Sequence, residues 1–176
     1  LSGERVRWSK DAEEFAATKE RLVGDCAVAC AFVSYCGPFN QEYRRYLLEE
    51  KYINDCRERG VPVNDEIDII AFLVDIATVG QWTLQQLPTD PLSVQNGILV
   101  SNSSRYPLLV DPQGQANKWI RKMEGKKEPG LKVVKQNEPN FVRTIEGAIS
   151  YGAPVLLENV PLEIDPVLES ILQRQV

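Results

Sequence analysis

A short apolar run, a turn and a helical pattern follow one another in residues 107–120, which read Pro107-Leu-Leu-Val-Asp-Pro-Gln-Gly-Gln-Ala-Asn-Lys-Trp-Ile120. The run Pro107 to Val110 is bounded by turn residues, which is typical of a short buried strand. After Gly114, apolar residues recur at helical spacing through Trp119 and Ile120. A strand that turns directly into a helix predicts the first part of a βαβ unit.

The same alternation continues along the rest of the chain. Leu131 to Val134 and Pro154 to Leu157 are further predicted strands, and Ile98 to Val100, after Asn96-Gly97, is another. A predicted helix begins after Asn140, and a last one begins at Asp165-Pro166, a cap followed by a first-turn proline. This order predicts an α/β fold in which helices cover a parallel sheet. The sheet is expected to be incomplete within this chain.

The first half of the chain predicts helices alone. Gly37-Pro38 ends the first helical pattern, and Asn40 is the predicted N-cap of the next helix. Asn64 or Asp65 is expected to cap a short third helix, and Thr78 with Gln81 is a predicted capping box. Apolar residues at three- and four-residue steps are expected on one face of a long helix or of two consecutive helices: Trp8, Ala12, Phe15, Ala16, Leu22, Val23, Cys26, Cys30 and Val33.

Composition excludes several classes of protein. The 176 residues hold 25 acidic and 20 basic side chains, a net charge of −5, and no histidine, so histidine-based catalysis or metal binding cannot occur within the chain. The longest apolar run has eight residues, Cys26 to Val33, far fewer than the roughly 20 of a membrane-spanning helix. No membrane partner is expected. The first residues resemble neither a start site nor a signal peptide, so the chain is expected to begin inside a longer one.

The turn before Gln115 occupies the place of a phosphate-binding loop but lacks its chemistry. The motif GxxxxGK[ST] needs glycines for close backbone approach, a lysine for the phosphates and a hydroxyl for magnesium. Gly114 matches the second glycine, whereas Leu109 stands at the first. Gln115 replaces the lysine and Ala116 the serine or threonine, and Asp111 and Gln113 lie in the same loop. We therefore predict a degenerate nucleotide pocket.

The partner motif of such a loop is an apolar strand that ends in Asp-Glu, with one carboxylate for the metal and one to polarise water. Here the strand ends in Glu158-Asn159, and an amide cannot accept a proton as a carboxylate does. No catalytic residue and no metal ligand are therefore predicted, and the loop is interpreted as a structural turn. One alternative is a module that itself binds or hydrolyses ATP.

A basic stretch raises a second alternative. Residues 118–135 hold seven bases and two acids, Glu124 and Glu128, so a nucleic-acid-binding module is conceivable. No aromatic residues alternate with these charges for base stacking, which favours a solvated surface or a contact with an acidic neighbouring domain. No nucleic-acid partner is therefore predicted.

Three long motifs carry a family resemblance. Residues 82–100, residues 105–120 with Asp-Pro-Gln-Gly-Gln-Ala-Asn-Lys-Trp-Ile, and residues 152–169 with Gly-Ala-Pro-Val-Leu-Leu-Glu-Asn-Val resemble the fifth AAA+ module of dynein heavy chains, more closely axonemal than cytoplasmic ones. Upstream, residues 3–8 and 22–39 resemble the returning stalk helix and the small helical part of the fourth module. Pro161 departs from the glycine of many relatives, which concerns only the turn before Leu162.

The resemblance implies a domain organisation and a function. Residues 1–20 would end the coiled-coil stalk helix, residues 21–77 would belong to the fourth module, and residues 78–176 would form a truncated large part of the fifth. Dyneins are ATP-driven, minus-end-directed microtubule motors. The main hydrolysis occurs in their first ring module, and the fifth is a non-hydrolysing element that relays conformational change. By this resemblance the parent protein is an ATPase, and the segment by itself is not an enzyme.

The same resemblance implies cofactors, partners and location. No cofactor is expected in this segment, whereas other modules of the parent motor would bind ATP and magnesium. The expected partners are the neighbouring AAA+ modules, the microtubule through the stalk, and dynein intermediate and light chains. The expected location is the axoneme of a cilium or flagellum, with the cytoplasm as the alternative. In AAA+ folds the first strand pairs with strands that this chain lacks, so the segment is not expected to fold stably alone.

Overall fold

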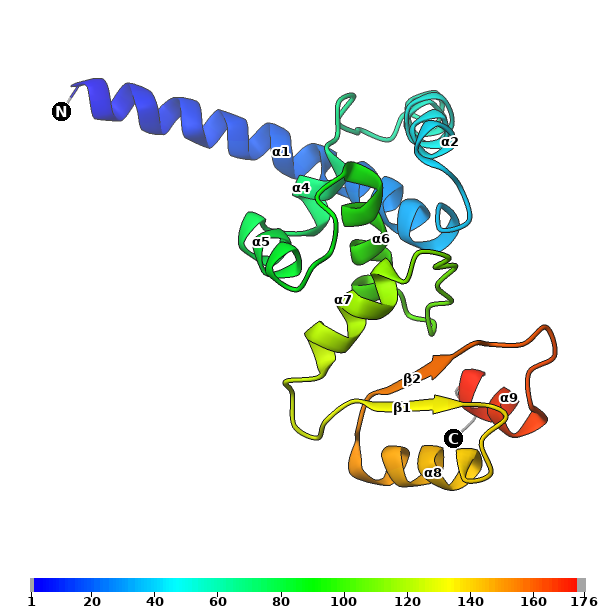
Figure 1. Ribbon diagram of the computed structural model, residues 1–176. Helices are drawn as coiled ribbons and strands as arrows, with labels where there is room; N and C mark the ends of the chain where they lie inside the picture. The colour runs from blue at the N-terminus through cyan, green and yellow to red at the C-terminus, as the bar shows by residue number, and fades with distance from the viewer. Residues whose placement is uncertain (1, 174–176) are drawn as a thin grey trace. The chain divides into compact units, whose positions relative to one another are not determined.

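The computed structural model describes residues 2–173 and divides into two units (Figure 1). The first unit comprises the residues up to Val79 together with residues 89–103, and the second comprises residues 80–88 together with the residues from Ser104 onward. The chain therefore passes between the units three times, after Val79, Pro88 and Ser103.

The first unit is built from helices. They are α1 (Ser2–Tyr35), α2 (Gln41–Tyr46), the π-helix η1 (Leu47–Ile53), α3 (Asn54–Glu58), α4 (Ile69–Leu73) and α6 (Pro91–Asn102), and α5 (Ile76–Leu84) leads into the second unit. The end of α1 contacts α4 and α6, and their shared core is apolar. The buried apolar side chains of this unit are Val28, Ala29, Phe32, Cys36, Leu48, Ile53, Val63, Ile69, Val94 and Ile98.

A single long first helix is confirmed, but most of its predicted apolar face is exposed and is not part of the core. Trp8, Phe15 and Val23 are 69%, 76% and 72% exposed. The buried face is the opposite one, on which Val28 and Phe32 lie one turn apart, because α4 and α6 contact α1 on that side. Nothing among the described residues packs on the apolar positions of the N-terminal half.

A glycine sets how closely α1 approaches the loop before α4. A Cβ atom at Gly24 would lie 2.2 Å from the Pro62 carbonyl oxygen and 2.9 Å from the Val63 Cβ. Next to it, the Asp25 carboxylate accepts a hydrogen bond of 2.7 Å from the Asn64 backbone N–H. The absence of a side chain at Gly24 therefore permits this contact.

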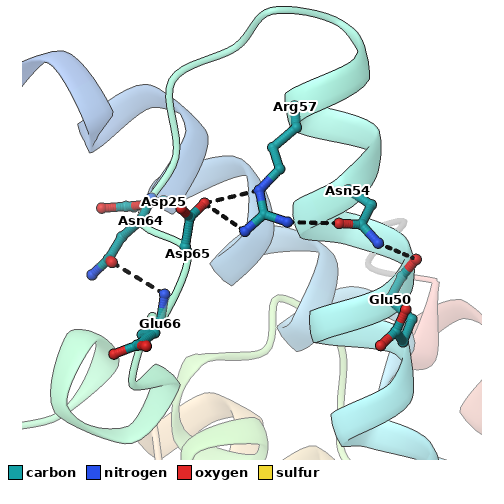
Figure 2. A network of polar contacts seen from close by, with 7 residues as sticks. All are labelled: Asp25, Glu50, Asn54, Arg57, Asn64, Asp65 and Glu66. Atoms are coloured by element: carbon teal, nitrogen blue, oxygen red, sulfur yellow. Dashed lines mark hydrogen bonds and ion pairs between the residues drawn. The ribbon is translucent and has the colours of Figure 1, made fainter.

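The helix caps predicted in the first unit follow the prediction at one site and depart from it at two. Asn40 caps α2 as predicted, because its side chain accepts a hydrogen bond from the Tyr43 N–H. Asp68 caps α4 in place of Asn64 or Asp65. Those two side chains have other partners: Asn64 accepts from the Glu66 N–H and Asp65 pairs with Arg57 (Figure 2).

The start of α5 is also capped by another residue than predicted. The Asp75 carboxylate accepts hydrogen bonds from both the backbone N–H and the hydroxyl of Thr78, at 2.7 and 2.9 Å. The predicted capping box of Thr78 and Gln81 is therefore wrong, because an aspartate three residues earlier takes the capping position.

The second unit has α/β structure. Its elements are α7 (Gln115–Glu124), β1 (Lys132–Lys135), α8 (Phe141–Tyr151), β2 (Val155–Glu158) and α9 (Pro166–Leu172). The strands are parallel, with Lys132 opposite Val155 and Lys135 opposite Glu158, and α8 is the connection between them (Figure 1). The predicted fold class and these two strands are confirmed.

The core of the second unit lies where α8 and α9 pack on the sheet. It contains Val134 from β1, Phe141 and Ile145 from α8, and Leu168 from α9. Trp119 is 1% exposed and packs edge to face on Trp82, with ring centroids 5.8 Å apart. Trp119 and Ile120 of α7 are buried, as their helical spacing predicts. On α8, the predicted inward positions Phe141, Ile145 and Ala148 are buried, whereas the fourth, Ile149, is 52% exposed.

Two predicted strands are wrong. Ile98 to Val100 lies inside α6, because Asp90 caps this helix and Pro91 begins it, so Asn96-Gly97 forms no turn. Pro107 to Val110 has no regular secondary structure, and Leu108 and Val110 are 74% and 91% exposed. The only sheet among the described residues is that of β1 and β2, which offers this segment no partner strand.

Within residues 2–173, no helix combines the length and apolar character needed to cross a membrane.

Candidate functional site

The loop before α7 is closed by its own aspartate. The Asp111 carboxylate accepts hydrogen bonds from the backbone N–H groups of Gln115 and Asn117, at 2.9 and 2.8 Å. Gly114 completes the turn in the left-handed region at φ 69°, which glycine adopts readily, and its N–H donates to the Asp111 carbonyl. The first amides of α7 are thus bound by a side chain of the same chain.

This arrangement opposes phosphate binding. In a phosphate-binding loop, the free N–H groups at the start of the helix donate to the phosphate oxygens, and the helix dipole favours the negative charge. Here Asp111 occupies two of these donors with its own negative charge, and Gln115 and Ala116 supply neither a cation nor a hydroxyl. A second anion at this position would be repelled.

The end of β2 is joined to the same helix. The Glu158 carboxylate accepts hydrogen bonds of 2.6 Å from the Asn117 side-chain amide and from the Arg121 guanidinium. Arg121 also donates to the Asn117 side-chain oxygen at 2.8 Å. The hydrogen bond from Asn117, followed by that from Arg121, lowers the pKa of Glu158 below its ordinary value. Glu158 is therefore ionised at neutral pH, and its Oε1 atom accepts from both donors.

Asn117 connects the two halves of the predicted site. Its backbone N–H donates to Asp111 and its side chain donates to Glu158, so the loop and the end of β2 are brought together through this one residue. Asn117 and Arg121 were not among the predicted site residues. Their i, i+4 spacing in the first turns of the predicted helix was the available signal.

The remaining predicted residues lie apart from this cluster. Gln113 and Gln115 have exposed side chains, and Ala116 is half-buried. Asn159 has a positive φ of 53° and lines a recess of about 330 Å³ together with Gln136, Asn137 and Pro161. These amides offer no carboxylate to a metal or to water.

A magnesium-bound nucleotide does not fit this set of groups. The helix amides are engaged by Asp111, and Glu158 is engaged by Asn117 and Arg121. Among residues 2–173, no group of three or more Asp, Glu, Cys or His side chains is placed to hold a metal ion. What the arrangement does provide is a rigid connection between α7 and β2.

Family models match both halves of the chain. The model for the ATP-binding dynein motor region matches residues 80–176, and that for the microtubule-binding stalk of the dynein motor matches residues 1–55. The chain belongs to the dynein motor family. The stalk match covers α1, α2 and η1, whereas the motor-region match includes α6 and the whole α/β part.

Individual dyneins are similar over the full chain. The flagellar outer-arm dynein gamma chain of Chlamydomonas reinhardtii is 47% identical over 176 residues, 100% of this chain and 4% of that protein. Human dynein axonemal heavy chain 8 is 44% identical over 174 residues, 99% of this chain and 4% of that protein. The chain thus spans about 4% of the length of these relatives. Their flagellar and axonemal character assigns this dynein segment to the axonemal cytoskeleton of cilia and flagella.

The two regions matched by the dynein family models do not coincide with the two structural units. Helix α6 lies in the matched motor region but packs in the first unit, against the end of the stalk-matched helix α1. The stalk-derived and motor-derived parts of this dynein chain therefore share one hydrophobic core.

Proposed function

We propose that this segment is a non-hydrolysing structural and allosteric part of the motor ring of an axonemal dynein heavy chain. The parent protein would be an ATP-driven, minus-end-directed microtubule motor. Residues 1–20 would end the stalk, residues 21–77 would form the small helical part of the fourth AAA+ module, and residues 78–176 would belong to the large part of the fifth.

The observation that carries this proposal is the closed loop at Asp111. Catalysis of phosphoryl transfer depends on positioned cations and on a base that orients water. Asp111 is bound to the α7 amides, and Glu158 is bound to Asn117 and Arg121. The pocket residues proposed as degenerate are Asp111, Gln113, Gly114, Gln115, Ala116, Glu158 and Asn159.

The arrangement of α1 supports the relay function. A helix of 34 residues is about 50 Å long and transmits displacement along its axis. Its C-terminal end packs on α6, and the chain continues from α6 into the second unit after Ser103. A shift of α1 would thereby reach the α/β part through packed and covalent connections.

The proposed partners follow from the two matched regions. The stalk would bind the microtubule, and the second unit would contact neighbouring AAA+ modules of the same heavy chain. Dynein intermediate and light chains would bind elsewhere on the parent protein. ATP and magnesium would be used in other modules, with no cofactor in this segment.

The test is ATP hydrolysis by a complete motor in which the first, third and fourth modules are disabled by substitution. We expect no hydrolysis above that of the same motor carrying Glu158→Gln. Hydrolysis that remains in the disabled motor and disappears with Glu158→Gln would contradict the proposal.

A further inference from the structure

Arg44 is a buried cation at the centre of the first unit. It lies on α2 and is 2% exposed. Burial lowers the pKa of its guanidinium, and the electrostatic interaction with the nearby Cys36 partly offsets this decrease. A buried guanidinium needs partners for its donors, because an unpaired buried charge is very costly.

One side of Arg44 holds the end of α1. Its Nε donates to the carbonyl oxygens of Cys36 and Phe39, at 3.0 and 2.9 Å, and Nη2 donates to that of Gly37 at 3.0 Å. These carbonyls lie just beyond the C-terminus of α1, where the helix dipole is negative and favours a cation. Arg44 thus serves as the C-terminal cap of α1.

The other side of Arg44 holds α6. Its Nη2 donates to the Asn96 side-chain oxygen at 2.7 Å, and Nη1 donates to that of Gln95 at 3.3 Å. Gln95 and Asn96 are 51 and 52 residues away from Arg44 in the sequence, respectively. The planar guanidinium therefore spans the gap between a stalk-matched helix and a motor-region helix with hydrogen bonds on both sides.

We propose that Arg44 is the positioning residue that couples movement of α1 to α6. This inference rests on the relay function proposed above and identifies the residue through which the relay passes. Charge-assisted hydrogen bonds are short and directional, so α6 must follow when the end of α1 shifts. A lysine has a single nitrogen and cannot bind acceptors on both helices in this geometry.

The test removes only the α6 side of this contact in the complete motor. The variants are Asn96→Ala and the double variant Gln95→Ala/Asn96→Ala, which leave Arg44 and its α1 carbonyls intact. Asn96 is itself exposed, and in both variants Arg44 keeps its three hydrogen bonds to the carbonyls of Cys36, Gly37 and Phe39. Asn102→Ala, an exposed position on the same helix, is the matched control. Asn96→Asp restores an acceptor for the guanidinium.

The measured quantity is the ratio of microtubule dissociation constants with and without ATP. We expect the double variant to reduce this ratio at least about fivefold, the lower end of typical coupling between sites. Asn96→Ala should lower it in the same direction. Asn102→Ala and Asn96→Asp should keep the wild-type ratio, and the basal ATPase rate should stay unchanged in all variants.

Two kinds of failure are distinguishable. A wild-type ratio in the double variant, an equal loss in Asn102→Ala, or no recovery in Asn96→Asp overturns the role of Arg44 while the relay stands. A wild-type motor whose microtubule affinity does not respond to ATP overturns the proposed relay and this inference with it.

Discussion

At the scale of single residues, Asp111 has two effects that comparison with the phosphate-binding motif does not predict. It stabilises the first turn of α7, and it occupies the amides that a phosphate would need. Gln115 and Ala116 stand where the motif has lysine and serine. In the same loop, the Asp111 carboxylate binds the amides that would otherwise bind a phosphate. The loop is stabilised in a form that does not require a ligand.

Replacement of Asp111 by alanine should loosen α7. Two N-terminal amides would lose their acceptor, which costs about 1–2 kcal/mol of local stability. Hydrogen exchange in the intact motor should then be roughly 5–30-fold faster in the first turn of α7. Asp111→Asn keeps one acceptor oxygen and should have a smaller effect. Unchanged exchange in Asp111→Ala would show that these hydrogen bonds do not stabilise the helix.

Gly24 determines a contact between two segments, and alanine should disrupt it. The added Cβ would lie 2.2 Å from the Pro62 carbonyl oxygen, so the loop must move away from α1. We expect faster hydrogen exchange at Asn64, whose backbone N–H donates to the Asp25 carboxylate.

Gly147→Ala in α8 is the matched control for Gly24→Ala. A Cβ at Gly147 meets nothing within 4 Å, so alanine should stabilise that helix by about 0.5–1 kcal/mol. Equal effects of the two substitutions on local exchange would contradict the close approach at Gly24.

At the scale of elements, the second unit depends on the apolar faces of α7 and α8. Trp119 and Phe141 are 1% and 3% exposed, so alanine at either should cost about 3–5 kcal/mol. The thermal unfolding of the intact motor, followed with local hydrogen exchange, measures this loss. Tyr151→Ala, at an 82% exposed position on α8, should change stability by less than about 0.5 kcal/mol. A near-silent effect at Trp119 or Phe141 would contradict the core.

Sequence patterns predicted some elements well, for reasons that are local. The helices α7, α8 and α9 and the strands β1 and β2 combine strong periodicity with clear turn residues, and Asp165-Pro166 marks a helix start unambiguously. The predicted cap of α4 was wrong because Asp68 caps this helix in place of Asn64 or Asp65. The predicted strand at Ile98 was wrong because Asp90 caps a helix, α6, that includes this residue. Which of several neighbouring polar residues caps a helix depends on which of their side chains already have other partners, as Asn64 and Asp65 do.

The sequence predicted the loop before α7 as a candidate site, but it did not predict the contacts that this loop makes. The loop was placed by the turn residues before a helical pattern, although the strand predicted in front of it is absent from the structure. The link from Asn117 to Glu158 spans 41 residues, and that from Arg44 to Asn96 spans 52. Pairs at such separations are set by the packing of elements, which local periodicity does not encode.

At the scale of the whole molecule, the segment should not fold cooperatively by itself. Its sheet has two parallel strands among the described residues, fewer than independent stability usually requires. Several large apolar side chains are also strongly exposed, including Leu108, Val110 and Leu162. The purified polypeptide should show a broad thermal transition and bind a hydrophobic dye. A sharp transition with an enthalpy near about 0.7 kcal/mol per residue would contradict this expectation.

The most direct test of the closed loop is a density map of the intact motor, determined at saturating ATP and magnesium. We predict no nucleotide beside Gly114, with the Asp111 carboxylate on the amides of Gln115 and Asn117 and Glu158 on Arg121. A nucleotide whose phosphates bind those amides, with magnesium coordinated by Glu158, would contradict the account.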